Sequence, residues 1–340
     1  MSMKKVNDYK KPRSLCIVIP IFNEELALPY FLDALQPIIE KLRKKLDVIV
    51  IFVNNGSTDG SVDIINSTDM GEINSAILTL TRNFGYEAGL IAGLTFVTSD
   101  CYCLIDADGE DPAHLLLDFL VSIESGNEIA IGLRQLRVES KLLQSFRRLG
   151  YKVLARISDD PFTVSAGNFS MFNSKVRNSI LIENSSYPFL RATVSRTGFK
   201  TEYFPHNRNP RLDGRSNFNK FGLLKFAVAG FMTTTTWPLR MAAYSLGLML
   251  PLGLSALVSS IIFDFSSTAG IVQNFSIFLF LSTQSVNIGI IAIYVARVYK
   301  NSLGRPLFYV DWHQSYATEK FPFEYPNENP IYINTNKKSF

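Results

Sequence analysis

Hydrophobic and polar positions alternate in blocks through the first third of the chain. Short apolar runs occupy 15–19, 48–53, 76–80 and 101–105, and longer helix-like stretches follow at about 24–45, 60–67, 86–98 and after Pro112. Apolar runs of this length are typical of strands buried on both faces of a parallel sheet. Their alternation with helices predicts a doubly wound α/β sheet with right-handed crossovers, to which 129–132 adds a further strand.

Polar loops follow the four apolar runs directly. They are Asn23 to Glu25, Asn54 to Gly60, Arg82 to Gly85, and Asp106 to Asp111. In an open α/β sheet, ligands bind beyond the carboxyl ends of the strands, where these loops would meet. The sequence therefore predicts an active site at this edge of the sheet.

The pattern changes after Phe221, where charged residues become rare. Met241 to Phe263 carries no charged side chain and is long enough to cross a bilayer, as is Ile271 to Ala296. Buried core helices seldom run so far without charge, so two transmembrane helices are expected. Asn219 to Met232 has apolar positions interspersed with lysines, which predicts an amphipathic helix at the membrane surface.

Basic residues flank the two predicted spans on one side only. Arg240 precedes the first span and Arg297, Lys300 and Arg305 follow the second, whereas the loop near 264–270 has neither Lys nor Arg. Because basic loops stay in the cytoplasm, both chain ends and the catalytic domain are expected there, in a two-span protein of the inner (plasma) membrane.

These patterns divide the chain into five parts. They are a polar tail (1–13), a cytoplasmic catalytic domain (14–218), an amphipathic interface helix (219–236), a two-helix transmembrane region (237–300) and a cytoplasmic tail (301–340). Within the catalytic domain, 134–156 is basic and helix-prone, and the region from Ser165 to Arg215 is expected to be less regular.

Composition excludes several other classes of protein. The 340 residues are 47% hydrophobic and carry a net charge of only +4, so a nucleic-acid partner is not expected. The three cysteines lie in predicted strands and the three histidines lack zinc-like spacing, which argues against a Cys/His metal site. The glycine motifs of ATPases and dinucleotide-binding proteins are also missing from the first strands and loops.

The acidic loop after the fourth strand can bind a divalent cation. Asp106 and Asp108 offer hard oxygen ligands suited to Mg²⁺ or Mn²⁺, which would also hold substrate phosphates. An isolated Asp-x-Asp is common in turns, but Glu110 and Asp111 extend this cluster. Asn23, Asn54 and their neighbours could bind a base and ribose, although Asn-Gly turns and helix caps would use the same residue types.

Several motifs, taken in order, resemble glycosyltransferase family 2, and more narrowly its membrane-bound polyprenyl-phosphate glycosyltransferases. They are Pro20 to Glu25, Asn54 to Gly60, Arg82 to Gly85, Asp106 to Pro112, Ser165 to Phe169, Arg208 to Arg211 with Gly214 and Ser216, and Arg305 to Leu307 after the second span. The resemblance implies a GT-A nucleotide-sugar-binding domain, a divalent cation and inverting transfer.

The resemblance also implies roles for individual residues. The implied donor-binding residues are Pro20, Asn23, Glu25, Asn54, Ser57, Arg82 and Asp106. The implied catalytic residues are Asp106, Asp108, Asn168, Arg208 and Arg211, of which the two arginines would contact phosphate. Asp108, with help from Glu110, would hold the metal.

This chain departs from the family pattern at several positions. The family usually has Asp where Asn54 stands, often Lys at Tyr86, and commonly Asp at Ser165 and Asn168; Asn217 also replaces a frequent Lys. With Asn instead of Asp at position 168, the identity of the general base stays open. A phosphate monoester is already largely an anionic nucleophile at neutral pH and has little need of a general base. The change therefore argues against a hydroxyl group as the acceptor more than against a lipid phosphate.

The sequence thus predicts a membrane glycosyltransferase that moves a sugar from a nucleotide donor to polyprenyl (undecaprenyl) phosphate. The side-chain carbonyl of Asn54 could accept a hydrogen bond from uracil, which favours UDP-glucose or a related UDP-sugar. Transfer to another lipid such as diacylglycerol, and a catalytically impaired scaffold, remain alternatives. Gln284 and Asn287 in the second span could pair between helices, so a homo-oligomer also stays open.

Overall fold

The computed structural model describes residues 11–71, 73–134, 156, 159, 166–183, 185–209, 235–262, 268–318 and 321. The chain forms two compact units. The first comprises 1–149, 161–219 and 306–340, and the second comprises 150–160 and 220–305.

An eight-stranded mixed sheet forms the centre of the first unit, with the strand order β7-β5-β6-β4-β1-β2-β3-β8. The strands are β1 (Ser14–Ile21), β2 (Asp47–Asn54), β3 (Asn74–Thr79), β4 (Cys101–Leu104), β5 (Ile129–Arg134), β6 (Ala166–Asn173), β7 (Thr201–His206) and β8 (Tyr316–Ala317). Neighbouring strands run parallel in β3-β2-β1-β4 and in β5-β7, whereas β6 and β8 pair antiparallel. The predicted strands are therefore confirmed.

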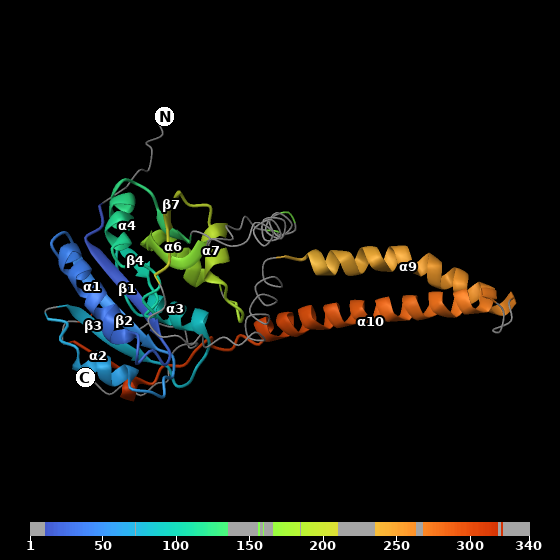
Figure 1. Ribbon diagram of the computed structural model, residues 1–340, viewed down its shortest axis with the longest axis horizontal. Coiled ribbons are helices and arrows are strands. Elements are labelled where there is room, and N and C mark those ends of the chain that lie inside the picture. The colour runs from blue at the N-terminus through green and yellow to red at the C-terminus, as the bar shows by residue number, and fades with distance from the viewer. Residues whose placement is uncertain are drawn as a thin grey trace, which may run out of the picture. The chain divides into compact units, whose positions relative to one another are not determined.

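Helices cover both faces of this sheet (Figure 1). They are α1 (Leu28–Arg43), α2 (Ser61–Ser67), α3 (Tyr86–Thr95), α4 (Leu115–Glu124), α6 (Ser174–Ile182) and α7 (Leu190–Arg196). Because successive side chains of a strand point to opposite faces, Leu15, Ile17 and Ile19 of β1 pack with α1 and α4, while Cys16 and Val18 pack with α3. The three cysteines are buried and reduced, as expected for core residues.

The expectation of an irregular region after Ser165 is wrong for the residues that the structure describes. Residues 166–206 contain β6, α6, α7 and β7, and β6 lies in the middle of the sheet between β4 and β5. The sequence of β6 mixes Gly, Asn and Ser with Phe and Met, so its own pattern is weak. Pairing with β4 and β5 stabilises β6 as a strand although its own β-propensity is low.

The segment after the second long helix joins the edge of the sheet, which the sequence did not indicate. Phe308 is buried, Asp311 N donates to Thr79 O at 2.8 Å, and the Thr79 hydroxyl donates to Gln314 O at 2.7 Å. A short 3-10 helix, η1 (Trp312–Gln314), and β8 follow. The first part of the predicted tail is thus a structural part of the catalytic unit.

The second unit contains two long helices, α9 (Trp237–Ile262) and α10 (Thr268–Ser302), which contact each other along their lengths (Figure 1). The segments Trp237–Ser259 and Gly270–Ser302 of these helices are long and apolar enough to cross a membrane. The most apolar stretch of each is largely exposed, with only 11% and 6% of it buried. Ser245 of α9 donates to the Asn287 side chain of α10 at 3.1 Å, so Asn287 does pair between helices, here within one chain.

Three expectations fall outside the described residues. These are the amphipathic helix at 219–236 except for its last two residues, the basic segment at 134–156 except for its ends, and the placement of Ser165, Arg211, Gly214, Ser216 and Asn217.

Candidate active site

The polar strand ends meet at one edge of the sheet, as predicted. β1, β2, β4, β5 and β7 share a direction, so the residues that follow them lie at the same edge. β6 runs the opposite way, with Ser170 opposite Leu104 and Ala166 opposite Leu133, which brings its first residues to this edge as well. Asn168 is therefore placed near the acidic loop.

Hydrogen bonds join the first two loops into one structure. Asn23 adopts a positive φ of 56°, which is uncommon outside glycine. Its side chain accepts from Thr58 N at 2.8 Å, and its own N–H donates to the Ser57 hydroxyl at 3.2 Å. The Glu25 carboxylate accepts from Gly60 N at 3.1 Å. The predicted donor-binding residues Asn23, Glu25 and Ser57 are thus adjacent.

The amides of Asn54 and Asn55 are used within this loop region. Asn54 is 4% exposed; its Oδ1 accepts from Ser57 N at 2.8 Å and its Nδ2 donates to the Thr79 hydroxyl at 3.5 Å. Asn55 donates to Gly85 O at 3.0 Å and accepts from Phe84 N at 2.9 Å. Both side chains therefore hold loop backbone in place, and contact of Asn54 with a base stays a prediction.

Gly56 allows the second and third loops to touch. Its φ is 76°, and a Cβ at this position would lie 2.8 Å from the backbone of Arg82 and Asn83. Arg82 itself is exposed, with its guanidinium 4.0 Å from the centre of the Phe84 ring. The Arg82 side chain is thus available at the rim of the site, as a donor-binding residue would be.

The acidic loop is held from two sides. Tyr86 donates to Asp106 Oδ1 at 2.5 Å, and Asp108 accepts from Glu110 N at 3.0 Å. Removal from water raises the pKa of Asp106 to about 7, and the charge of Asp108 adds to this. Two neighbouring carboxylates in such a place favour binding of a cation.

Arg208 forms an ion pair with Glu110. Asn209, the next residue, reaches the same loop, since its N–H donates to Glu110 O at 2.9 Å and its side chain donates to Gly109 O at 3.2 Å. The structure therefore brings together two residues predicted for different roles, a phosphate contact and a metal ligand. In this arrangement each neutralises the other.

Asp111 is the most buried carboxylate of the loop and binds two basic side chains. It is 3% exposed, with Oδ2 3.0 Å from the Arg134 guanidinium and Oδ1 3.2 Å from His206 Nε2. Burial opposes ionisation, but the hydrogen bonds from His206 and Arg134 outweigh it and lower the pKa of Asp111. This network fixes Arg134, at the carboxyl end of β5, beside the acidic loop.

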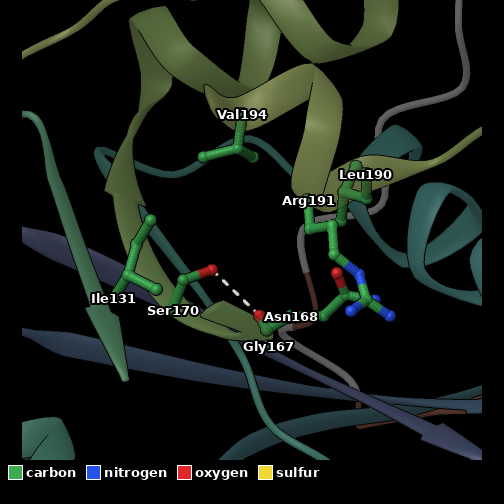
Figure 2. A pocket seen from close by; sticks show the side chains of 7 residues that line it. All are labelled: Ile131, Gly167, Asn168, Ser170, Leu190, Arg191 and Val194. Atoms are coloured by element: carbon green, nitrogen blue, oxygen red, sulfur yellow. Dashed lines mark hydrogen bonds between the residues drawn. The ribbon is translucent and has the colours of Figure 1, made fainter. Parts of the chain in front are cut away.

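Asn168 lies on β6 at the inner side of the site. It is 8% exposed, and its Nδ2 donates to Glu87 Oε1 at 3.3 Å. Asn168 also lines a small cavity between β6 and α7, shown in Figure 2, together with Ile131, Ser170, Leu190, Arg191 and Val194. An amide does not take up a proton at neutral pH, so Asn168 has no capacity to act as a general base.

The donor set of the acidic loop fits a hard divalent cation. Mg²⁺ is commonly bound by one or two carboxylates together with water and substrate phosphates, so Asp106 and Asp108 suffice without a closed cage. Among the described residues there is no group of three or more His, Cys, Asp or Glu side chains arranged to hold a metal. Two carboxylates would leave further coordination positions for water and for the phosphates of a substrate.

Sequence reasoning missed Glu87, Arg134 and His206 as parts of the site. Arg134 and His206 stand at the carboxyl ends of strands, a position that could have identified them. Glu87 stands in the first turn of α3 and gave no comparable signal.

Comparisons with known proteins relate this chain to glycosyltransferases. Residues 16–181 match the model of glycosyl transferase family 2. This region of the chain is therefore similar to the domain of family 2 glycosyltransferases, and the match supports a glycosyltransferase activity.

Two relatives are similar over most of their length. A prophage bactoprenol glucosyl transferase homolog of Escherichia coli is 29% identical over 87% of this chain and 98% of its own, and an uncharacterized glycosyltransferase of Bacillus subtilis, YkcC, is 28% identical over 89% and 94%. A solved mannosyltransferase of Pyrobaculum calidifontis, in complex with GDP-Man and Mn²⁺, is 16% identical over 84% of this chain and 76% of its own, with a TM-score of 0.40.

Proposed function

We propose that this protein transfers a sugar, with inversion, from a nucleotide-sugar donor to polyprenyl phosphate at the cytoplasmic face of the membrane. The observation that carries the proposal is the combination, in one glycosyltransferase chain, of a strand-end site bearing carboxylates and arginines with two exposed apolar helices. The similarity to bactoprenol glucosyl transferases supports the lipid acceptor. A UDP-sugar, UDP-glucose or a relative, is the proposed donor.

The surfaces of α9 and α10 support membrane anchoring. Large apolar side chains on both helices are exposed, for example Leu248 at 72%, Phe278 at 66% and Ile288 at 66%. A soluble protein rarely exposes so large an apolar surface, whereas a bilayer would cover it. The basic residues beside the spans support a topology with both chain ends in the cytoplasm.

In the proposed reaction, an acceptor phosphate oxygen attacks the anomeric carbon of the sugar. The bond from that carbon to the nucleoside diphosphate breaks, and the diphosphate leaves with the electron pair. Because the acceptor is already anionic, no side chain has to remove a proton, which fits an amide rather than a carboxylate at Asn168.

Positive charge has to offset two anions that approach each other. A bound Mg²⁺ or Mn²⁺, held by Asp106 and Asp108 with Glu110 nearby, would neutralise the leaving diphosphate. Arg134 is fixed by Asp111 and Arg208 by Glu110, so both guanidinium groups are positioned beside the same loop. Arg208 and Arg211 are proposed to bind the acceptor phosphate. Arg208 would leave its ion pair with Glu110 and form one with the phosphate instead.

The test is transfer by the purified full chain in detergent or vesicles. Radiolabelled UDP-glucose, UDP-N-acetylglucosamine and GDP-mannose are each offered with undecaprenyl phosphate or diacylglycerol, with Mn²⁺ or with EDTA. We expect metal-dependent labelling of undecaprenyl phosphate from a UDP-sugar, giving a lipid that mild acid hydrolyses. Labelling of diacylglycerol alone would favour the other acceptor, and no transfer or donor hydrolysis with any pair would favour a scaffold.

A further inference from the structure

The Glu87 carboxylate connects three elements around the site. It projects from the first turn of α3, where Oε2 accepts from Leu190 N at 3.0 Å and Oε1 accepts from Asn168 Nδ2 at 3.3 Å. Leu190 is the first residue of α7, and Asn168 belongs to β6. One side chain thus ties the start of α7 and the polar end of β6 to the helix that carries Tyr86.

The contact with Glu87 also determines the orientation of the Asn168 amide. A carboxylate only accepts hydrogen bonds, so Nδ2 must face Glu87 and Oδ1 must face away. Asn168 Oδ1 is buried and has no hydrogen-bond partner among the residues that the structure describes. Leaving a buried acceptor unpaired is unfavourable, so this oxygen is a candidate to accept from a donor that the described residues do not supply.

The Asn168 side chain lies close to the donor-binding residues. Tyr86, the neighbour of Glu87, donates to Asp106 Oδ1 at 2.5 Å. On the other side, Asn168 and Arg191 line the same cavity (Figure 2). The amide oxygen is therefore at the junction between the Asp106 side of the site and α7.

We propose that Glu87 is a positioning residue: it holds the Asn168 amide so that Oδ1 accepts a hydrogen bond from a hydroxyl group of the bound substrate, and it fixes the start of α7. This inference rests on the proposed function, since it assigns a residue to the same site. The chemical requirement is one of polarity. The group at position 87 must accept a hydrogen bond from position 168, and the group at position 168 must offer an acceptor on the side away from Glu87.

A polarity swap tests this requirement. In Glu87→Gln, the new amide satisfies Leu190 N with its oxygen, so its NH₂ faces Asn168 and turns the Asn168 amide around, which presents a donor outward. In the double variant E87Q/N168D, the amide introduced at position 87 donates to one oxygen of the carboxylate introduced at position 168, and the other oxygen faces outward. The pair then has the same total charge as the wild type and the outward acceptor is restored.

We expect E87Q to lower kcat about tenfold, the equivalent of one hydrogen bond made in the transition state, with KM for the donor changed less than about threefold. The double variant should recover to within about threefold of wild type. Glu40→Gln, an exposed glutamate of α1 paired with Arg43, is the matched control and should leave kcat unchanged.

The single variant Asn168→Asp adds a pH signature. Removal from water already raises the pKa of Glu87, opposed by Leu190 N, Asn168 and the charge of Arg191 on α7, while Tyr86 lies beside it on α3. A second carboxylate at 168 would share one proton with Glu87 at low pH and repel it once that proton is lost. The activity of N168D should therefore fall relative to wild type as the pH rises, and E87Q/N168D should lack this fall.

Thermal unfolding separates this proposal from the proposed function. Each single variant should lower Tm and the double variant should restore it, and this coupling can be measured whether or not the lipid is the acceptor. If the wild type is inactive but the double variant still restores the Tm that the single variants lose, the proposed function is contradicted and the contact between Glu87 and Asn168 is supported. A folded double variant that is no better than the poorer single variant, in kcat and in Tm, would overturn the positioning role.

Discussion

Replacing Asp111 by Asn should destabilise the catalytic unit strongly, although the two side chains have nearly the same shape. The Asp111 carboxylate is 1% exposed as a side chain and is shared by Arg134 and His206, whereas the Arg134 side chain is 29% exposed. An Asn has one acceptor oxygen, so with that oxygen on Arg134 its NH₂ group would face His206, whose Nε2 accepts only in the other tautomer. In either case Arg134 loses the negative charge that it pairs with.

The expected cost follows from leaving a buried charge without its partner. Breaking a buried ion pair costs about 3–5 kcal/mol, and the partial exposure of Arg134 argues for the lower end. For a unit of this size, about 3 kcal/mol corresponds to a fall of about 6–12 °C in Tm. The assay is thermal unfolding of the detergent-purified full chain, followed by near-ultraviolet circular dichroism.

Two further variants identify the cause of the loss. Glu183→Gln breaks the exposed pair with Arg196, of which the side chains are 32% and 38% exposed, and should change Tm by less than about 3 °C. Asp111→Leu combined with Arg134→Met removes both charges and should recover part of the loss. A Tm for D111N within about 2 °C of wild type would refute the view that Asp111 anchors this network.

Three other outcomes are expected. Asp108→Asn should abolish metal-dependent transfer with an unchanged circular dichroism spectrum, because the amide lacks the charge that binds the cation; retained metal dependence would remove Asp108 from the metal site. Asn55→Asp should weaken donor binding about tenfold in calorimetry, since a carboxylate cannot donate to Gly85 O, and unchanged affinity would show that the loop does not need this contact. A cysteine placed at Ser267 should react with an impermeant reagent from outside the cell. Cys16, Cys101 and Cys103 are buried, so they should give little background labelling. Labelling only from the inside would contradict the proposed topology.

The sequence predicted those parts of the fold that depend on local pattern. The runs around β1, β2 and β4 are apolar because both faces of a parallel strand are buried, and the loops after them are polar because they leave the core. β6 escaped prediction because its position between two strands compensates for a mixed composition. The contacts of Glu87 could not be inferred, since Asn168 and Leu190 lie 81 and 103 residues away in the sequence.

Asn54 and Asn168 stand at positions where the family resemblance leads us to expect carboxylates, and their contacts bear on whether the chain is an enzyme or an inactive scaffold. Asn54 and Asn168 each donate through the side-chain NH₂, Asn54 to the Thr79 hydroxyl and Asn168 to the Glu87 carboxylate. A carboxylate in place of Asn168 would put two acidic groups in contact, so the amide suits its surroundings. Loss of function without selection would be expected to leave mismatched partners, whereas here the NH₂ group of each amide donates to an oxygen acceptor. This agreement favours a binding site over an inactive scaffold, in line with the proposed function.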